Sequence, residues 1–189
     1  MTLTGITIAN FPADIILDSG VVFIGATKFG VTRGEPKFTP NRSIQNIEFD
    51  GKHAPIRGID RFMHGEPSLA FTMMELGGTG TGNQIDRLEP GNTDATVTTV
   101  ITHTMAPGGG LVAAGSYVTD LRAIWERGTS ASNLFFAVLF PVALCTKYEL
   151  GGQNRGEGLI SVEFVGRLDL ATQTTSDAAY KLEYRTTLP

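Results

Sequence analysis

Residues 159–170 alternate between apolar and polar side chains, and this period of two constrains the fold more than any other feature of the sequence. A strand places successive side chains on opposite faces of a sheet. The pattern therefore predicts a strand with one face in the core and one face mostly exposed to solvent. The residues expected on the core face are Ile160, Val162, Phe164, Gly166, Leu168 and Leu170, and those between them are Ser161, Glu163, Val165, Arg167 and Asp169.

Two other segments also have the composition of strands. Residues 68–76 place Leu69, Phe71 and Met73 on one side and other small or apolar residues on the other, so both faces should be at least partly covered. Residues 96–102 are rich in Thr and Val and are bounded by turn formers. Each segment is therefore predicted to be a single strand.

Residues 118–127 fit two patterns. Val118, Leu121 and Trp125 have the spacing of a helix, whereas Leu121, Ala123 and Trp125 have the spacing of a strand. Periodicity alone does not separate the two, and we prefer a strand.

Hairpins are predicted at two places. Residues 14–25 contain two apolar segments around a Ser19-Gly20 turn, and Asp50-Gly51 separates residues 44–49 from residues 56–62. Proline donates no backbone hydrogen bond, so a proline-marked segment cannot pair regularly along its whole length. Part of the second region is therefore expected to be an extended loop or an edge, because it contains Pro36, Pro40 and Pro55.

Helix is scarce in this sequence. The best candidate is residues 84–89, where Thr81 or Asn83 offers a cap and Pro90-Gly91 ends the segment.

Two glycine-rich segments, residues 77–82 and 107–110, are interpreted as flexible connections inside one domain. The prediction is a mainly β protein in which residues 1–189 form a single domain.

Length and composition support this class and limit the function. A chain of 189 residues buries enough surface to fold without a disulfide or a metal ion. Its net charge of −4 argues against tight binding to nucleic acid, which needs clustered Lys and Arg. The only cysteine, Cys145, is expected to be a small buried apolar residue.

The longest apolar run, residues 134–145, contains Pro141 and is too short to span a bilayer, which needs about twenty residues. The first residues also lack the basic start of a signal peptide.

No catalytic set is apparent. The GGTGTG sequence at residues 77–82 lacks the Lys that a phosphate-binding loop needs after its last glycine. His53, His64 and His103 have no carboxylate or cysteine at metal-ligand spacing, and no G-x-S-x-G motif is present. We therefore expect no enzyme activity, cofactor or metal.

Charge is distributed unevenly along the chain. Residues 28–61 hold seven basic and four acidic residues, a local +3 that leaves −7 for the rest of a chain whose total is −4. Complementary charge steers association, so a basic segment of one copy could meet the acidic body of another. Charge alone fits merely solvated strands equally well.

One sequence pattern resembles a known family. KFTPNRSIQNIEFDGKHAPIRGIDRF, followed by a β stretch ending in FTMMEL, is similar to the N-terminal half of siphophage major tail tube proteins. SYVTDLRAIWERG and GLISVEFVGRLDL resemble later strands of that family, so the resemblance of pattern covers most of the chain. The arm pattern N-R-x-I-x-x-I-x-x-D-G is matched here by Asn41, Arg42, Ile44, Ile47, Asp50 and Gly51.

The resemblance implies a β-sandwich or partly rolled barrel with one short flanking helix and a long extended loop or hairpin arm. It also implies that six copies close into a ring, and that rings stack into a tube that conducts the DNA genome during ejection. Its partners would be further copies, tail tip and tail terminator proteins, a tape measure protein in the lumen, and double-stranded DNA passing with weak, non-specific contact. The protein would be part of the virion tail, assembled in the host cytoplasm without a membrane.

The resemblance and the charge pattern together suggest a site. Residues 30–54 are expected to form an assembly arm that contacts the adjacent ring, and residues 55–76 the sheet that anchors it. The basic residues proposed to meet carboxylates there are Arg33, Lys37, Arg42 and Lys52.

Three alternatives stay open. The chain could form the tube of a contractile tail or of a phage-derived particle, and the sequence does not separate these from a siphophage tail. A carbohydrate-binding β-sandwich is the alternative from another class. Such a module normally exposes aromatic residues, whereas Trp125 lies in an apolar pattern that favours the core.

Overall fold

A computed structural model gives the fold. It describes residues 20–29, 32–46, 60–63, 65–74, 87–88, 93–97, 100–104, 112, 114–126, 135–152, 158–168 and 178–189. This part of the chain is mainly β, with almost no helix. Its elements are β1 (Val21–Ile24), β2 (Thr27–Lys28), β3 (Lys37–Thr39), β4 (Ser43–Asn46), β5 (Asp60–Met63), β6 (Ser68–Met73), β7 (Thr93–Val97), β8 (Val100–Thr104), the 3₁₀ turn η1 (Ala114–Ser116), β9 (Val118–Glu126), β10 (Phe135–Gly151), β11 (Leu159–Gly166) and β12 (Lys181–Arg185).

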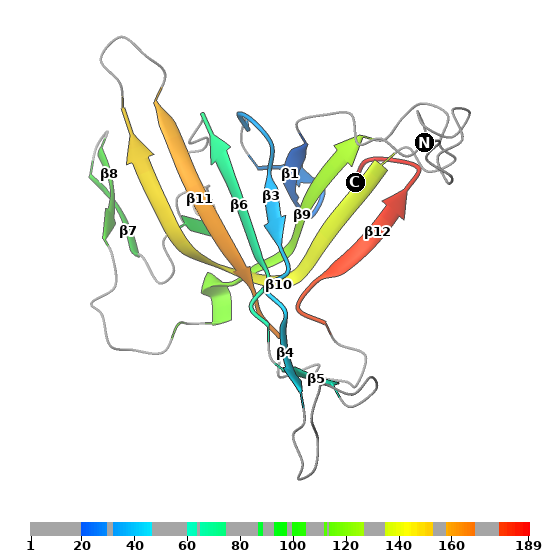
Figure 1. Cartoon of the computed structure of the whole chain (residues 1–189). Helices are drawn as coiled ribbons and strands as arrows, with labels where there is room; N and C mark the ends of the chain where they lie inside the picture. Colours follow the sequence, from blue (N-terminus) through cyan, green and yellow to red (C-terminus); the bar gives the residue numbers. More distant parts are fainter. Residues whose placement is uncertain are drawn as a thin grey trace.

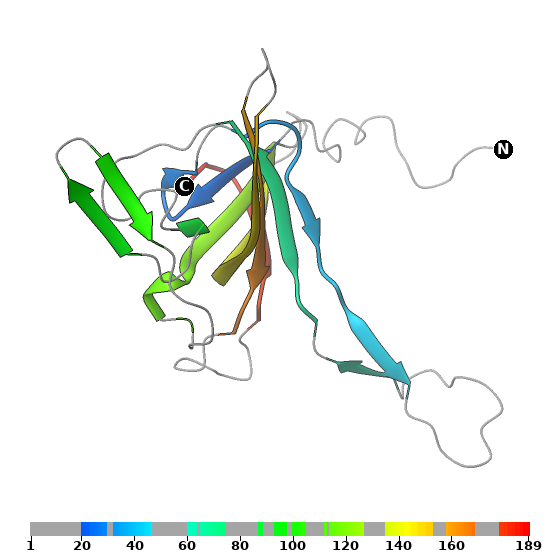
Figure 2. The same cartoon turned by 90° about the vertical axis from the view of Figure 1, so that its left-hand side faces the viewer.

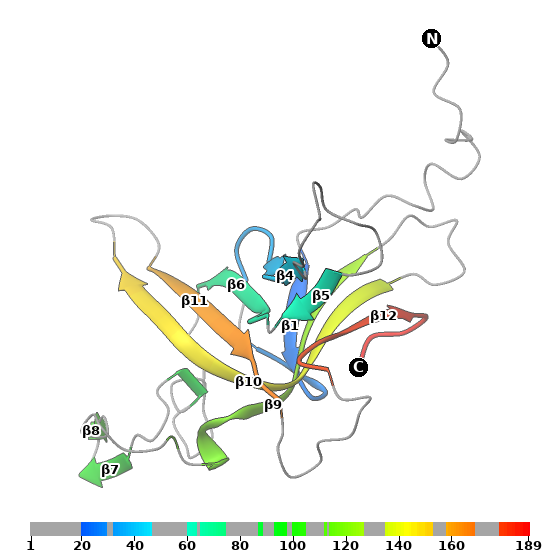
Figure 3. The ribbon, with the colours of Figure 1, turned by 60° about the horizontal axis from the view of Figure 1, so that its bottom comes forward.

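Eight of these strands form one antiparallel sheet, in the order β2-β1-β9-β10-β11-β6-β3, with β12 paired to β10 (Figure 1). The long strand β10 has different partners along its length. Its first half pairs with β9 and β12, and its second half pairs with β11. Figure 3 shows β10 bending between these two halves. The predicted mainly β class is therefore confirmed.

Pro141 lies where β10 changes partners. Pairing with β12 ends at Leu139 and pairing with β11 begins at Ala143. On the other side, the register with β9 has no pair for Pro141 opposite Asp120, whose φ is 59°. A proline has no N–H to give to a ladder, so this gap is a position that tolerates one inside an interior strand. The apolar run around Pro141 is thus a central strand.

The core follows the predicted alternation on β11 and β6. Ile160, Val162 and Phe164 are buried, and the register places Val162 opposite Phe71 of β6. Phe29, which follows β2, packs edge-on against both Phe71 and Phe164 with ring centroids 6.1 Å apart. The sheet therefore curls enough for the β1-β2 end to contact the β6-β11 part.

The preferred strand at residues 118–127 is confirmed as β9, and the structure explains its mixed pattern. Val118 and Leu121 are both buried three residues apart, and Phe140 and Ala143 of β10 show the same spacing. The two strands break their period of two together, at Asp120 and Pro141. A local irregularity of the ladder thus produced the helix-like spacing.

One predicted hairpin stays a prediction, and one predicted strand needs correction. β1 pairs with β2 across Gly25-Ala26, a reversal that was not predicted. The hairpin predicted around Ser19-Gly20 is not tested, because residues 14–19 lie outside the described residues. The predicted single strand at 96–102 is wrong, because β7 and β8 pair antiparallel with Val97 opposite Val100. The Thr- and Val-rich composition favoured strand throughout and carried no glycine or asparagine to mark the reversal.

The clearest predicted strand is shorter than expected. β11 ends at Gly166, and Leu168, expected on the core face, is 39% exposed. The backbone leaves β6 here, because the N–H of Arg167 donates to the carbonyl of Val142 at 2.9 Å. Of the predicted helix at 84–89, the structure describes Arg87 and Leu88, which are helical, and the buried Leu88 faces the core. Leu170 lies outside the described residues.

Candidate interaction surface at the base of the arm

β4 and β5 form a hairpin of their own, with Ile44 opposite Phe62. Neither strand pairs with the eight-stranded sheet, and the hairpin projects away from the end of the sheet where β3 leads out and β6 leads in (Figures 1 and 2). This confirms pairing between the two segments predicted to flank the Asp50-Gly51 turn, although that turn lies outside the described residues. Pro40 stands between β3 and β4, as expected for a segment that does not pair continuously. The bounds differ from the predicted arm, residues 30–54, and the predicted anchoring sheet, residues 55–76, because β3 pairs with β6 in the sheet and β5 belongs to the hairpin. From here on we call residues 43–63 the arm.

The described part of the arm has little support from the body of the protein. A two-stranded hairpin alone is marginally stable in water, and the side chain of Ile44 is 60% exposed. Among the described strands, β4 and β5 pair only with each other, so each has an outer edge that can pair with another chain.

The start of the arm is fixed by contacts of two small residues. Asn41 has a φ of 42°, a conformation that Asn tolerates better than most residues, and its side-chain amide donates to the carbonyl of Glu66 at 2.8 Å. A Cβ on Gly65 would lie 2.6 Å from the carbonyl oxygen of Asn41. The two chain segments at the base of the arm are thus in direct contact.

Arg42 joins this base to the C-terminal part of the chain. Its Nε and Nη2 donate to the Tyr180 hydroxyl at 3.1 and 2.5 Å, and its guanidinium carbon lies 6.0 Å from the centre of the Tyr180 ring. Tyr180 also packs against Phe38 of β3. Arg42 forms no ion pair with a carboxylate among the described residues, and the group that accepts its hydrogen bonds is a neutral oxygen.

A second guanidinium lies nearby. Arg167 forms an ion pair with Glu66, with Nη1 3.0 Å from Oε1, and both side chains are partly exposed. The two arginines border a hollow of about 290 Å³ at the base of the arm. We call this the basal hollow; its described lining is Pro40, Arg42, Gly65, Pro67, Gly166, Arg167, Leu168, Ala178, Ala179 and Tyr180.

The predicted contact residues do not gather in one place. Arg33 and Lys37 are exposed and lie along β6, where the backbone N–H of Arg33 donates to Thr72 at 2.8 Å and Lys37 pairs with Ala70. Arg42 lies at the base of the arm. Lys52 lies outside the described residues. Contact of these residues with another copy remains a prediction.

The sequence did not predict the contact between Arg42 and Tyr180, or the position of Arg167 beside the same hollow. Tyr180 is 138 positions from Arg42. No local signal connects residues at such separation, so they meet through the tertiary fold.

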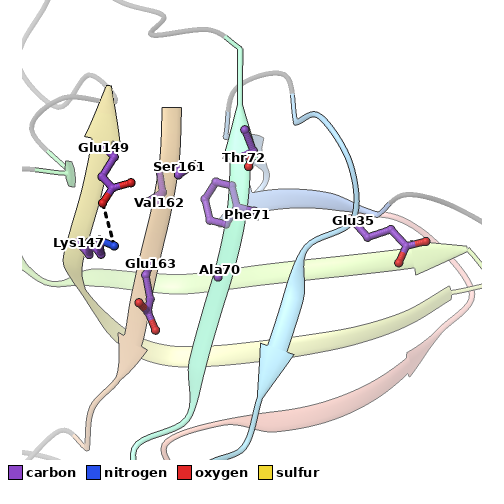
Figure 4. A pocket seen from close by; sticks show the side chains of 9 residues that line it. All are labelled: Glu35, Ala70, Phe71, Thr72, Lys147, Glu149, Ser161, Val162 and Glu163. Atoms are coloured by element: carbon purple, nitrogen blue, oxygen red, sulfur yellow. Dashed lines mark ion pairs between the residues drawn. The ribbon is translucent and has the colours of Figure 1, made fainter. Parts of the chain in front are cut away.

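The open face of β10, β11 and β6 carries a second group of charges (Figure 4). Lys147 and Glu149 are two residues apart on one strand and therefore share a face, and their Nζ and Oε1 atoms are 2.9 Å apart. The hydrogen bond and the negative charge of Glu149 raise the pKa of Lys147, and Glu163 adds to this. Both members of the pair are well exposed, so the pair contributes little to stability. A hollow of about 290 Å³ lies here, with Glu35 on its far side.

The structure offers no cluster of metal-binding side chains within its described residues. No group of three or more His, Cys, Asp or Glu residues that could hold a metal ion occurs there. Cys145 is 5% exposed, which confirms its prediction as a buried residue. None of the helices in the described ranges has the length and apolar character needed to cross a membrane.

Comparison with known proteins adds no family. No family model matches the chain, and no curated protein sequence matches it significantly.

Proposed function

We propose that this protein is a structural subunit of a phage tail tube, in which six copies form a ring and stacked rings form a channel for the DNA genome. The observation that carries the proposal is the arm, a hairpin that leaves the sheet and exposes an apolar side chain. A subunit that must hold on to further copies needs such a segment, whereas a self-contained monomer gains nothing from it.

The fold proposed with this function is a β-sandwich or partly rolled barrel. Contacts between the two ends of the sheet support it, because Phe29 near β2 packs on Phe71 of β6 and Phe164 of β11. Closing the ring would then pair the edges of neighbouring sheets and remove exposed strand edges.

The net negative charge of the protein is compatible with a channel through which DNA passes. Six copies at −4 carry a formal −24 per ring. A channel wall without excess positive charge binds phosphates weakly, so the duplex can slide. A tube of a contractile tail or of a phage-derived particle would have the same requirements and belongs to the same proposal.

A carbohydrate-binding module has weaker support. Such a site uses several exposed aromatic rings. The only tryptophan, Trp125, is 8% exposed, and among the described residues Tyr184 is the one aromatic side chain that is largely exposed, at 62%.

Negative-stain electron microscopy of the purified protein tests the proposal. Six domains around a channel as wide as a DNA duplex give rings or tubes about 100 Å across. Such particles are the expected result. A monodisperse monomer that never polymerises, even with tail initiator proteins present, would contradict the proposal.

A further inference from the structure

The basal hollow contains a positive charge that no described residue neutralises. Among the described residues, Arg42 contacts the Tyr180 hydroxyl and the Tyr180 ring, both of them uncharged. Arg167 differs, because Glu66 already pairs with it. Arg42 is exposed, so an incoming anion can reach it.

The guanidinium of Arg42 is also held in position. Two of its N–H groups are fixed on one oxygen, and the Tyr180 ring lies beside its plane while packing against Phe38. A guanidinium has five N–H donors in a planar fork that suits a carboxylate. A fixed arginine loses less side-chain entropy when it pairs, so it binds a carboxylate better than a mobile one does.

We propose that the basal hollow receives a carboxylate side chain from a second copy of this chain, which pairs with Arg42. This rests on the proposed function and adds the chemistry of the contact. The occupant is a copy because the chain has 19 acidic residues against 15 basic ones, and its net charge complements the hollow.

The placement of the hollow supports a head-to-tail contact. Arg42 follows β3 and lies at the arm end of the sheet, whereas Glu35 precedes β3 and lies toward its other end (Figures 1 and 4). Glu35 is exposed and forms no ion pair with any described residue. Copies stacked end to end bring unlike ends together, which is how a heterologous interface propagates into a filament.

The test compares the critical concentration for assembly of the full chain and three variants, measured by sedimentation and electron microscopy. Arg42→Gln removes the charge and Arg42→Lys retains it, while both lose the two-point contact with Tyr180. Lys28→Gln is the matched control, because it removes one charge from an exposed position outside the hollow. Circular dichroism checks that each variant is folded.

We expect Arg42→Gln to raise the critical concentration about five-fold, the equivalent of 1 kcal/mol for a pair at the upper end of exposed ion pairs. Arg42→Lys should fall between the unmodified protein and Arg42→Gln, because it keeps the charge and loses the fixed planar fork. Lys28→Gln should equal the unmodified protein. Added salt should weaken assembly of the unmodified protein and reduce its advantage over Arg42→Gln, because salt screens an exposed pair.

Three results would overturn the inference. Equal, salt-independent loss in both Arg42 variants would mean that Arg42 only holds the arm in place. Unchanged assembly of Arg42→Gln would reject the carboxylate contact and leave the proposed function standing. Unmodified protein that never assembles would reject both.

Discussion

Gly166 shows how a single residue fixes the route of the chain. A Cβ at this position would lie 2.7 Å from both the carbonyl oxygen of Ala179 and the Cδ1 atom of Phe140. Phe140 is fully buried and cannot move aside, so Gly166→Ala should lower the free energy of unfolding by about 1–3 kcal/mol, as for other overpacked sites. Urea denaturation measures this.

Gly152 provides the matched control for that substitution. It is exposed, and a Cβ there would have no atom within 4 Å, so Gly152→Ala should leave the urea midpoint nearly unchanged. Equal midpoints for the two variants would show that the space around Gly166 adjusts, and that the close approach of β11 to the segment before β12 is not required.

The arm is an element that the core does not need. β4 and β5 pair only with each other among the described strands, and Asn41 and Gly65 meet directly at the base. Replacing residues 43–63 with a short Gly-Ser turn should therefore preserve the folded monomer and its unfolding midpoint within about 0.5 kcal/mol, the usual range for changes outside the core. Assembly into rings or tubes should be lost.

Calorimetry and electron microscopy of this shortened chain separate the two effects. A full-length chain with Ile44→Thr serves as the milder control, because it keeps the arm and removes only an exposed apolar side chain. Tubes formed by the shortened chain with normal yield would show that the arm plays no part in assembly.

At the scale of elements, the sequence predicted strands better than it predicted reversals. The alternation at β11 and the apolar positions of β6 were read correctly, since period two follows directly from strand geometry. The reversal between β7 and β8 was missed because Thr and Val favour strands on both sides of it. The reversal between β1 and β2 was also missed, although Gly25, whose φ is 59°, marks it.

The candidate site was predicted only in part. Pairing across the Asp50-Gly51 region was expected, and β4 and β5 do pair. The bounds of the arm were not predicted, because β3 lies in the sheet and β5 in the hairpin. The chemistry around Arg42 depends on Tyr180, Glu66 and Arg167, whose proximity follows from how β6, β11 and β12 are arranged. Such long-range contacts leave no periodic signal in the sequence.

At the scale of the whole molecule, the proposed conduit must contact its copies strongly and DNA weakly. With a net charge of −4, the protein should show no retention of double-stranded DNA at about 0.15 M salt, because non-specific affinity comes from neutralised phosphates. Filter binding over a range of salt concentrations measures this.

The positive control is the double variant Glu149→Lys and Glu163→Lys, which brings the formal charge from −4 to 0. Together with Lys147, the two new residues place three lysines on the open face. That variant should gain retention that falls steeply as salt increases. Salt-dependent retention by the unmodified protein, equal to that of the variant, would mean that the protein binds DNA instead of letting it pass through the channel.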